Sequence, residues 1–151
     1  MKIVSPAFRN GERIPQQYSC HGANMSPPLS VSDVPEGARS LVLIMEDPDV
    51  PRNLREDGMW DHWIVYNIPP DWQGIEEGEE PPGDHGTGTA GNTNYYGPCP
   101  PDREHRYFFK LFALDTAIEA GNQPSKDEVL KAMDGHVLES AELLGFFAPP
   151  E

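Results

Sequence analysis

Positive charge is scarce in this sequence. Its 151 residues contain 11 Lys and Arg against 25 Asp and Glu, and the formal net charge is −14. Because no basic cluster offsets the repulsion, the composition excludes a protein that binds the phosphate backbone of nucleic acid, and it disfavours anionic membrane surfaces. A charge of this size serves solubility, and it also fits a host with a salty cytoplasm.

Long apolar runs and cysteines are also scarce. No stretch approaches the length of a bilayer span, and Met1 to Pro6 lacks the apolar core of a signal peptide. We therefore expect no integral membrane association and a cytoplasmic protein. Cys20 and Cys99 are the only cysteines, and their wide separation favours two reduced thiols over a disulfide framework.

Proline and glycine are abundant, with 17 and 14 residues. They are spread among apolar clusters rather than gathered in a repeat, which favours many short elements joined by loops. The length indicates a single domain over residues 1–151. These features predict a mainly β fold.

Three segments predict the principal strands. Arg39 to Met45 is a continuous apolar run that predicts a strand covered on both faces and brings Asp47 to its end. In residues 62–68, alternation places His62, Ile64, Tyr66 and Ile68 on one side. Residues 106–114 form the most aromatic segment, and His105 at its start shares the parity of Tyr107.

Other segments predict loops and helices. Residues 71–91 are acidic, rich in Gly and Pro and poor in large apolar side chains, which predicts a long surface loop. A capping-box pattern at Ser125 to Glu128 predicts a helix start. After Gly135, the apolar residues between 137 and 144 resume helical spacing.

Carboxylates, imidazoles and a phenol gather at the ends of the predicted strands. Asp47 in Asp-Pro-Asp can simply begin a turn, and His62 or His105 alone can be a core-edge residue. Together with Tyr107 they can form a shared polar site. A metal site lacks a short-spaced ligand motif, Cys99 could be a nucleophile, and imidazoles with backbone amides can bind a phosphate or carboxylate. Arg106 alternates away from this group and suits a structural ion pair with a carboxylate.

The motifs, taken together, resemble the phosphatidylethanolamine-binding protein family, in its prokaryotic branch similar to the Raf kinase inhibitor protein. The matching pieces follow the family's order over nearly the whole chain: YSCHG at 18–22 with SPPL at 26–29, DPDVP at 47–51, WDHWIVYNIP at 60–69, YYGPCPP at 95–101, HRYFFKLFALD at 105–115 and GHVLESAELLG at 135–145. DPDxP, GPCPP and HRY in combination are highly specific.

The resemblance implies a Greek-key β-sandwich with a large central antiparallel sheet and short helices, the clearest of them near the C-terminus. It also implies a small anion-binding pocket near one edge. The pocket walls carried over to this chain are Asp47, Asp49, Trp60, His62, Gly97, Pro98, His105 and Tyr107.

The first hypothesis for function is therefore a binding protein without catalytic residues. Its ligand is phosphate, a phosphorylethanolamine-like group or a phosphorylated residue, and we expect no cofactor and no metal. A kinase or protease partner and a homodimer are further possibilities implied by the family. The alternative is a hydrolase or metal-dependent enzyme that uses the same pocket.

Overall fold

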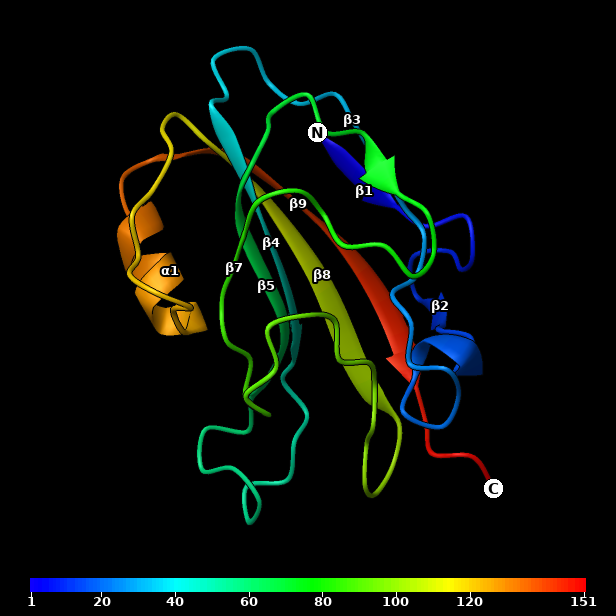
Figure 1. The fold of residues 1–151 in the computed structure, drawn as a ribbon. Coiled ribbons are helices and arrows are strands. Elements are labelled where there is room, and N and C mark those ends of the chain that lie inside the picture. The colour runs from blue at the N-terminus through cyan, green and yellow to red at the C-terminus, as the bar shows by residue number, and fades with distance from the viewer.

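The computed structural model describes all 151 residues as two β-sheets and one α-helix (Figure 1). The large sheet has the strand order β2-β9-β8-β4-β5-β7, and the small sheet has the order β1-β3-β6. The strands are β1 (Lys2–Val4), β2 (Glu12–Arg13), β3 (Leu29–Ser32), β4 (Ser40–Asp47), β5 (Trp60–Ile68), β6 (Gly74–Ile75), β7 (Asp84–His85), β8 (His105–Leu114) and β9 (Val137–Phe147). The helices are the 3-10 helix η1 (Gln16–Tyr18) and α1 (Lys126–Met133).

The large sheet is the middle of three layers. Its pairs are antiparallel except β2 with β9, which is parallel. A main core of 19 buried residues joins one face of the large sheet to the small sheet, and eight buried residues pack the other face near α1 (Figure 1). The expected mainly β fold with a large central sheet is confirmed.

The central strands agree with their sequence patterns. Every residue of β4 is buried, as its continuous apolar run predicts for a strand covered on both faces. In β8, alternate residues from His105 to Ala113 are buried and face the main core. The shared parity of His105 and Tyr107 is therefore confirmed.

The helix α1 begins where the sequence predicts. The hydroxyl of Ser125 accepts a hydrogen bond from the Glu128 amide, and the Glu128 carboxylate accepts one from the Ser125 amide, which completes a capping box. The helical spacing predicted for residues 137–144 is wrong, because this segment belongs to β9. It pairs with β8 over nearly its whole length, and these cross-strand hydrogen bonds override the local pattern.

The predicted loop at 71–91 also contains structure. Two-residue strands β6 and β7 add to the two sheets, and Trp72 is buried in the main core. Glu80 accepts hydrogen bonds from the Trp63 indole and the Tyr95 amide. Two-residue strand pairings, one buried tryptophan and the hydrogen bonds of Glu80 fix this segment. None of these contacts produces a periodic pattern in the sequence.

An irregularity in β5 changes the side on which Ile68 lies. Asn67 has a φ of 53° at a register shift against β4, and Ile68 consequently joins Val65 in the main core. The prediction that Ile68 shares the side of Ile64 and Tyr66 is therefore wrong. A bulge adds one residue to a strand and reverses the alternation beyond it.

The expectation of two reduced thiols is wrong. Cys20 and Cys99 form a disulfide that spans 79 residues of sequence. By the loop-length relation, a closure of this size stabilises the fold by about 4.5 kcal/mol. Sequence separation carries no information on this pairing, because the sheets bring the two segments together. The structure contains no helix with the length and apolar character that a bilayer crossing requires.

Candidate functional site

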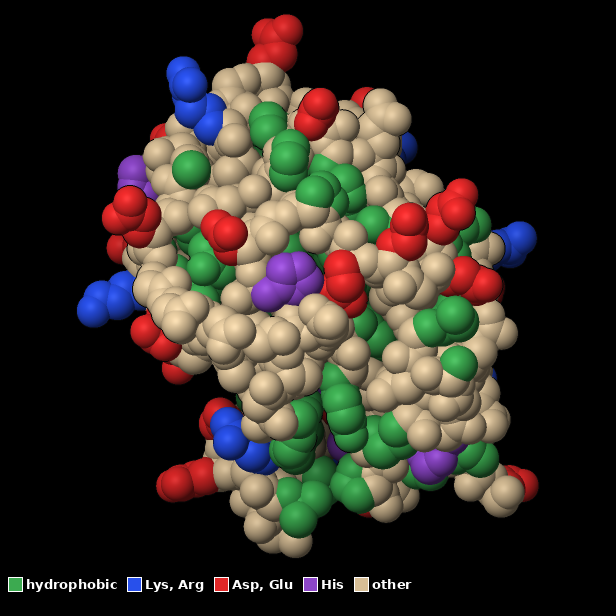
Figure 2. Space-filling model, viewed as in Figure 1, with side chains coloured by type: hydrophobic (Ala, Val, Ile, Leu, Met, Phe, Trp, Pro, Cys, Tyr) green, Lys and Arg blue, Asp and Glu red, His purple; other side chains and the backbone are tan.

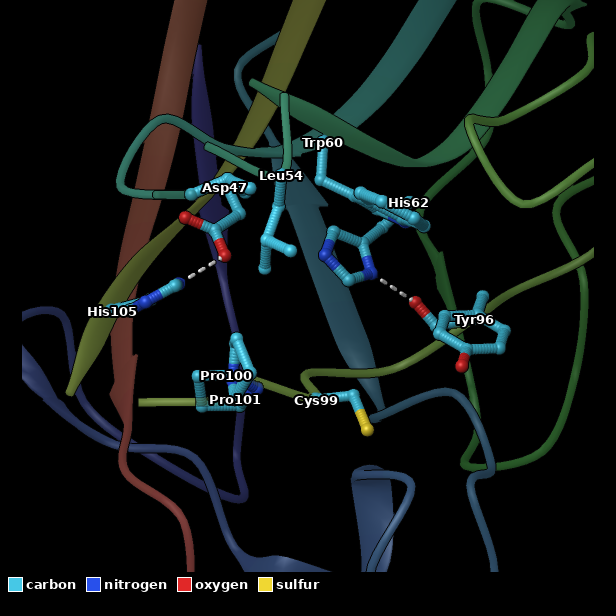
Figure 3. A pocket seen from close by; sticks show the side chains of 10 residues that line it. Asp47, Leu54, Trp60, His62, Tyr96, Cys99, Pro100, Pro101 and His105 are labelled. Atoms are coloured by element: carbon cyan, nitrogen blue, oxygen red, sulfur yellow. Dashed lines mark hydrogen bonds and ion pairs between the residues drawn. The ribbon is translucent and has the colours of Figure 1, made fainter. Parts of the chain in front are cut away.

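A cavity of about 220 Å³ opens beside the ends of the central strands. Figure 2 shows a hollow toward the bottom of the face drawn in Figure 1, with hydrophobic side chains around it. Polar groups and apolar side chains share its walls (Figure 3). The lining residues are Asp47, Val50, Leu54, Trp60, His62, Tyr96, Cys99, Pro100, Pro101 and His105.

Strand ends place Asp47 and His105, two buried polar residues of the pocket. Asp47 ends β4 and His105 begins β8, and the two strands are antiparallel neighbours. Both residues have the parity of the main core, so their side chains leave the sheet on the same side. The core covers them, with exposed fractions of 3% for Asp47 and 0% for His105.

A bulge brings His62 into the same space. Met45 pairs with Trp63 and Glu46 pairs with Asp61, so His62 is the extra residue between two pairs. The bulge allows His62 and Trp63 to lie on the main-core side together, while strict alternation would separate them. The His62 ring then meets the ring of Tyr107 edge-on, with 5.4 Å between the centroids.

Both ring nitrogens of His105 contact carboxylates. Nδ1 lies 2.6 Å from Oδ2 of Asp47, and Nε2 lies 2.7 Å from Oδ1 of Asp102. Ionised carboxylates only accept hydrogen bonds, so the doubly protonated imidazolium satisfies both contacts. Asp47 fixes the ring from inside the fold, and Asp102 meets it from the loop that precedes β8.

The Asp47 carboxylate is held on both oxygens. Oδ1 accepts a hydrogen bond from the Asp49 amide at 2.8 Å, and Oδ2 faces His105. Burial is the largest influence on its pKa and raises it, although the hydrogen bonds from His105 and the Asp49 amide oppose the change. Asp47 therefore serves to orient His105.

His62 makes different contacts from His105. Its Nδ1–H donates to the carbonyl of Tyr96 at 2.7 Å, because a carbonyl can only accept. Burial lowers the pKa of His62 to about 4, so the ring is neutral near pH 7. The other ring nitrogen then carries a lone pair, and Figure 3 shows it pointing into the pocket.

The structure brings together four of the eight predicted site residues in the pocket lining: Asp47, Trp60, His62 and His105. The other four lie beside it. Gly97 and Pro98 stand between the lining residues Tyr96 and Cys99, and Tyr107 is fully buried behind His62. Asp49 is turned toward Arg106. The part that each of the eight residues plays in binding stays a prediction.

The contact between Asp49 and Arg106 is the structural ion pair expected for Arg106. The guanidinium donates to both Asp49 oxygens, at 3.0 and 2.8 Å, and the Arg106 amide donates at 2.9 Å. The hydrogen bonds from Arg106 lower the pKa of Asp49. This clamp ties the loop after β4 to the start of β8, on which His105 lies.

The sequence reasoning missed Asp102 and the apolar lining. Asp102 lies three residues before His105, and this spacing across a proline-rich turn is the signal that could have suggested the contact. Val50 lies within the DPDVP motif and Leu54 follows it, but neither side chain carries a polar atom that marks a site. The structure adds them through the fold of the loop.

The sulfur of Cys99 in the pocket wall is bonded to Cys20. In this state it carries no free thiol, so Cys99 cannot attack a substrate. One group of three potential metal ligands has its ligand atoms within 4.8 Å of one another, and it consists of Cys20, His21 and Cys99. The carboxylates and imidazoles of the pocket do not converge in this way.

The family model described as Phosphatidylethanolamine-binding protein matches residues 4–148. The chain belongs to this family. A crystal structure of a putative member from Chlamydia trachomatis superposes with a TM-score of 0.95 at 49% identity and covers 99% of this chain and 97% of that one. The E. coli protein YbcL, described as a new member of the mammalian family, gives a TM-score of 0.87 at 28% identity, with 99% and 98% covered.

Sequence relatives in the family are equally complete matches. A UPF0098 protein of Chlamydia trachomatis is 50% identical over 147 residues, which cover 97% of this chain and 98% of the relative. Another from Methanothermobacter thermautotrophicus is 46% identical over 153 residues, with the same coverage. The resemblance seen in the sequence motifs, including its prokaryotic branch, is confirmed.

Proposed function

We propose that this phosphatidylethanolamine-binding protein homologue binds a small phosphate-bearing anion in the pocket and has no catalytic role of its own. One observation carries the proposal: Nε2 of buried His105 already holds the oxygen of an anion, the Asp102 carboxylate. A phosphate oxygen presents a similar charged acceptor and can take this place when Asp102 moves away.

His62 adds a requirement on the ligand. Its free ring nitrogen accepts a hydrogen bond, so the ligand needs a donor on that side of the pocket. The hydroxyl of a singly protonated phosphate meets this requirement, and so does the ammonium of phosphorylethanolamine. The pocket therefore combines a donor at His105 with an acceptor at His62, which suits such ligands better than a fully ionised, donor-free anion.

The apolar lining supports an organic substituent on the anion. Val50, Trp60, Pro100 and Pro101 form walls without charge, and Leu54 stands half exposed at 58%. Pockets of this composition usually orient a ligand with few polar groups and enclose its carbon part with apolar ones. A phosphorylated side chain or a head group fits this pattern.

The test is a titration with inorganic phosphate and with phosphorylethanolamine. Calorimetry measures the affinity, and the NMR chemical shifts of the histidine rings report where the ligand binds. His105→Gln keeps the size of the side chain but removes the cationic donor, and we expect at least a tenfold loss of affinity. His136→Gln is the matched control, because His136 is exposed and pairs only with Asp115. Equal binding by both variants contradicts the proposal.

The competing proposal is a hydrolase in the same pocket. It predicts that the protein hydrolyses an activated phosphate monoester and that the rate depends on His62, because the free ring nitrogen of His62 could accept a proton. The binding proposal predicts that such an ester binds in the pocket, competes with phosphate and is released without being hydrolysed. Turnover that disappears in His62→Gln would replace the binding proposal with the enzymatic one.

A kinase or protease partner, a homodimer and a cytoplasmic location also stay proposals. The partner and the dimer rest on family membership alone, and the disulfide removes one of the two features that favoured the cytoplasm. The acidic segment 71–91 is the place to test for a partner. Asp71→Asn with Glu76→Gln neutralises charges whose carboxylates make no hydrogen bond, and a pull-down against wild type would show whether they matter.

A further inference from the structure

The disulfide region contains three potential metal ligands. The ligand atoms of Cys20, His21 and Cys99 all lie within 4.8 Å of one another. Cys99 and His21 are exposed and Cys20 is partly exposed, so the group is open to solvent and to a reductant. We propose that reduction of the disulfide turns this cluster into a zinc site held by Sγ of Cys20, Sγ of Cys99 and a ring nitrogen of His21.

Hydrogen bonds hold the two cysteine segments together independently of the disulfide. The Cys20 amide donates to the carbonyl of Pro98 at 3.1 Å, and the Tyr95 hydroxyl donates to the carbonyl of Tyr18 at 2.7 Å. The Gly97 amide donates to Oδ1 of Asn24 at 2.8 Å. Breaking the S–S bond therefore leaves both thiols on adjoining backbones.

The third ligand is also positioned. The ring of His21 lies nearly parallel to the ring of Phe147, with 6.2 Å between centroids and 12° between planes. The His21 amide donates to the Ser19 hydroxyl at 3.1 Å, which fixes the backbone beside Cys20. Neither contact uses a ring nitrogen, so both nitrogens stay free for a metal.

The ligand set selects the ion. Two thiolates and one imidazole favour Zn²⁺ over Mg²⁺ or Ca²⁺, which prefer oxygen ligands. Tetrahedral zinc with bonds of about 2.3 Å to sulfur needs the two sulfurs about 3.8 Å apart, which rotation of the cysteine side chains can provide. The two thiolates also balance the charge of the ion, and the fourth position stays open to water.

The chemistry balances with a dithiol reductant. The dithiol gives two electrons and two protons to the Cys20–Cys99 bond and becomes a disulfide, and two protein thiols result. Zn²⁺ then displaces the two thiol protons as it binds. Because Cys99 lines the pocket, the metal stands beside the wall of the proposed anion site.

The test uses the full chain reduced with a phosphine, which becomes a phosphine oxide and is then removed under argon. Zn²⁺ is titrated against a chromophoric chelator, and Co²⁺ is added separately to detect thiolate charge-transfer bands. We expect one equivalent of Zn²⁺ and these bands in the reduced protein, and neither in the oxidised protein. Equal zinc binding in both states would overturn the proposal.

Variants separate the ligands. Cys99→Ser should abolish binding, and His21→Ala should weaken it at least tenfold, whereas His136→Ala, at another exposed histidine, should leave it unchanged. Binding that is as tight in His21→Ala as in wild type would overturn the three-ligand site. Circular dichroism follows the fold, and a reduced chain that stays unfolded both with and without Zn²⁺ would equally reject the proposal.

Discussion

His105 and Asp102 form a contact between a fully buried ring and a partly exposed carboxylate. Nε2 of His105 lies 2.7 Å from Oδ1 of Asp102, and the side-chain exposures are 0% and 38%. The buried partner is fixed by Asp47 on its other side, whereas the loop partner can turn toward water. Asp102 is therefore an internal anion that competes with any external one for the same donor.

Removal of this competitor should strengthen phosphate binding. In Asp102→Ala, Nε2 of His105 loses its internal acceptor, and one negative charge beside the pocket is removed. We expect about a tenfold lower dissociation constant for phosphate, which corresponds to about 1.4 kcal/mol. Calorimetric titration at constant ionic strength measures the change.

Glu104→Ala is the control for charge alone. Glu104 is exposed, lies two residues from Asp102 and has no side-chain contact with the pocket. It should change the affinity far less, because exposed charges are screened by water and salt. An equal gain in both variants would show that net charge explains the effect and that Asp102 is not a competitor.

The sequence contained most of the information that places Asp47 and His105, but not enough to place His62. Period-two alternation carries Asp47 and His105 to one face, and the structure agrees. For His62 the same rule gives the side of Ile64, opposite the main core. The bulge against Glu46 decides its side, and bulges depend on the register of a neighbouring strand, which one sequence segment does not encode.

His62 should make stability depend on pH. Its pKa is about 4 in the fold, against the ordinary histidine value of 6.5 that applies in the unfolded chain. Between these values the unfolded chain binds a proton that the folded chain does not, so the free energy of unfolding falls as the pH decreases from 6.5 to 4. The full loss is roughly 3 kcal/mol. Urea unfolding at a series of pH values measures it.

His62→Gln tests the origin of this loss. Glutamine can still donate to the carbonyl of Tyr96 but does not titrate, so the decline between pH 6.5 and 4 should be reduced by the His62 contribution. His136→Gln removes an exposed histidine as a control for the loss of one imidazole, and it should leave the His62 contribution in place. A decline as steep in His62→Gln as in wild type would assign the effect to other groups.

The ion pair of Asp49 and Arg106 should stabilise the loop beside the pocket. Asp49→Asn keeps the shape but weakens three hydrogen bonds, and we expect a loss of about 1–2 kcal/mol at pH 7. Since Arg106 lowers the pKa of Asp49, this stability is present above the unfolded pKa and is lost as the pH falls through the folded value. Urea unfolding at pH 7 and in acid checks both parts.

Asp57→Asn is the matched change in an exposed ion pair. Asp57 contacts Arg55 at 3.3 Å with side-chain exposures of 58% and 40%, and exposed pairs contribute little. We expect a smaller loss than at Asp49. Equal losses would mean that the Asp49 clamp has no special role in holding the loop.

Long-range contacts explain the remaining predictions from the sequence that were wrong. Residues 137–144 have helical spacing, yet the partner strand β8 and its hydrogen bonds determine their structure. Cys20 and Cys99 lie 79 residues apart, and only the packing of their segments brings them together. Local patterns predicted β4, β8 and the start of α1 well, because burial and capping act within a few residues.

Gly97 should be the least replaceable residue beside the pocket. A Cβ atom at this position would lie 2.0 Å from the carbonyl oxygen of Tyr18 and 2.6 Å from Oδ1 of Asn24, so Gly97→Ala must push apart the segments that carry Cys20 and Cys99. We expect a loss of about 3 kcal/mol in urea unfolding, together with weaker phosphate binding.

Gly91→Ala is the comparison for this change. The added methyl group meets no atom within 4 Å and only the φ of 81° at Gly91 opposes it, so we expect a cost of about 1 kcal/mol. If Gly97→Ala costs no more than Gly91→Ala, close backbone packing does not hold these segments together, and the preformed thiol pair inferred for the reduced state loses its support.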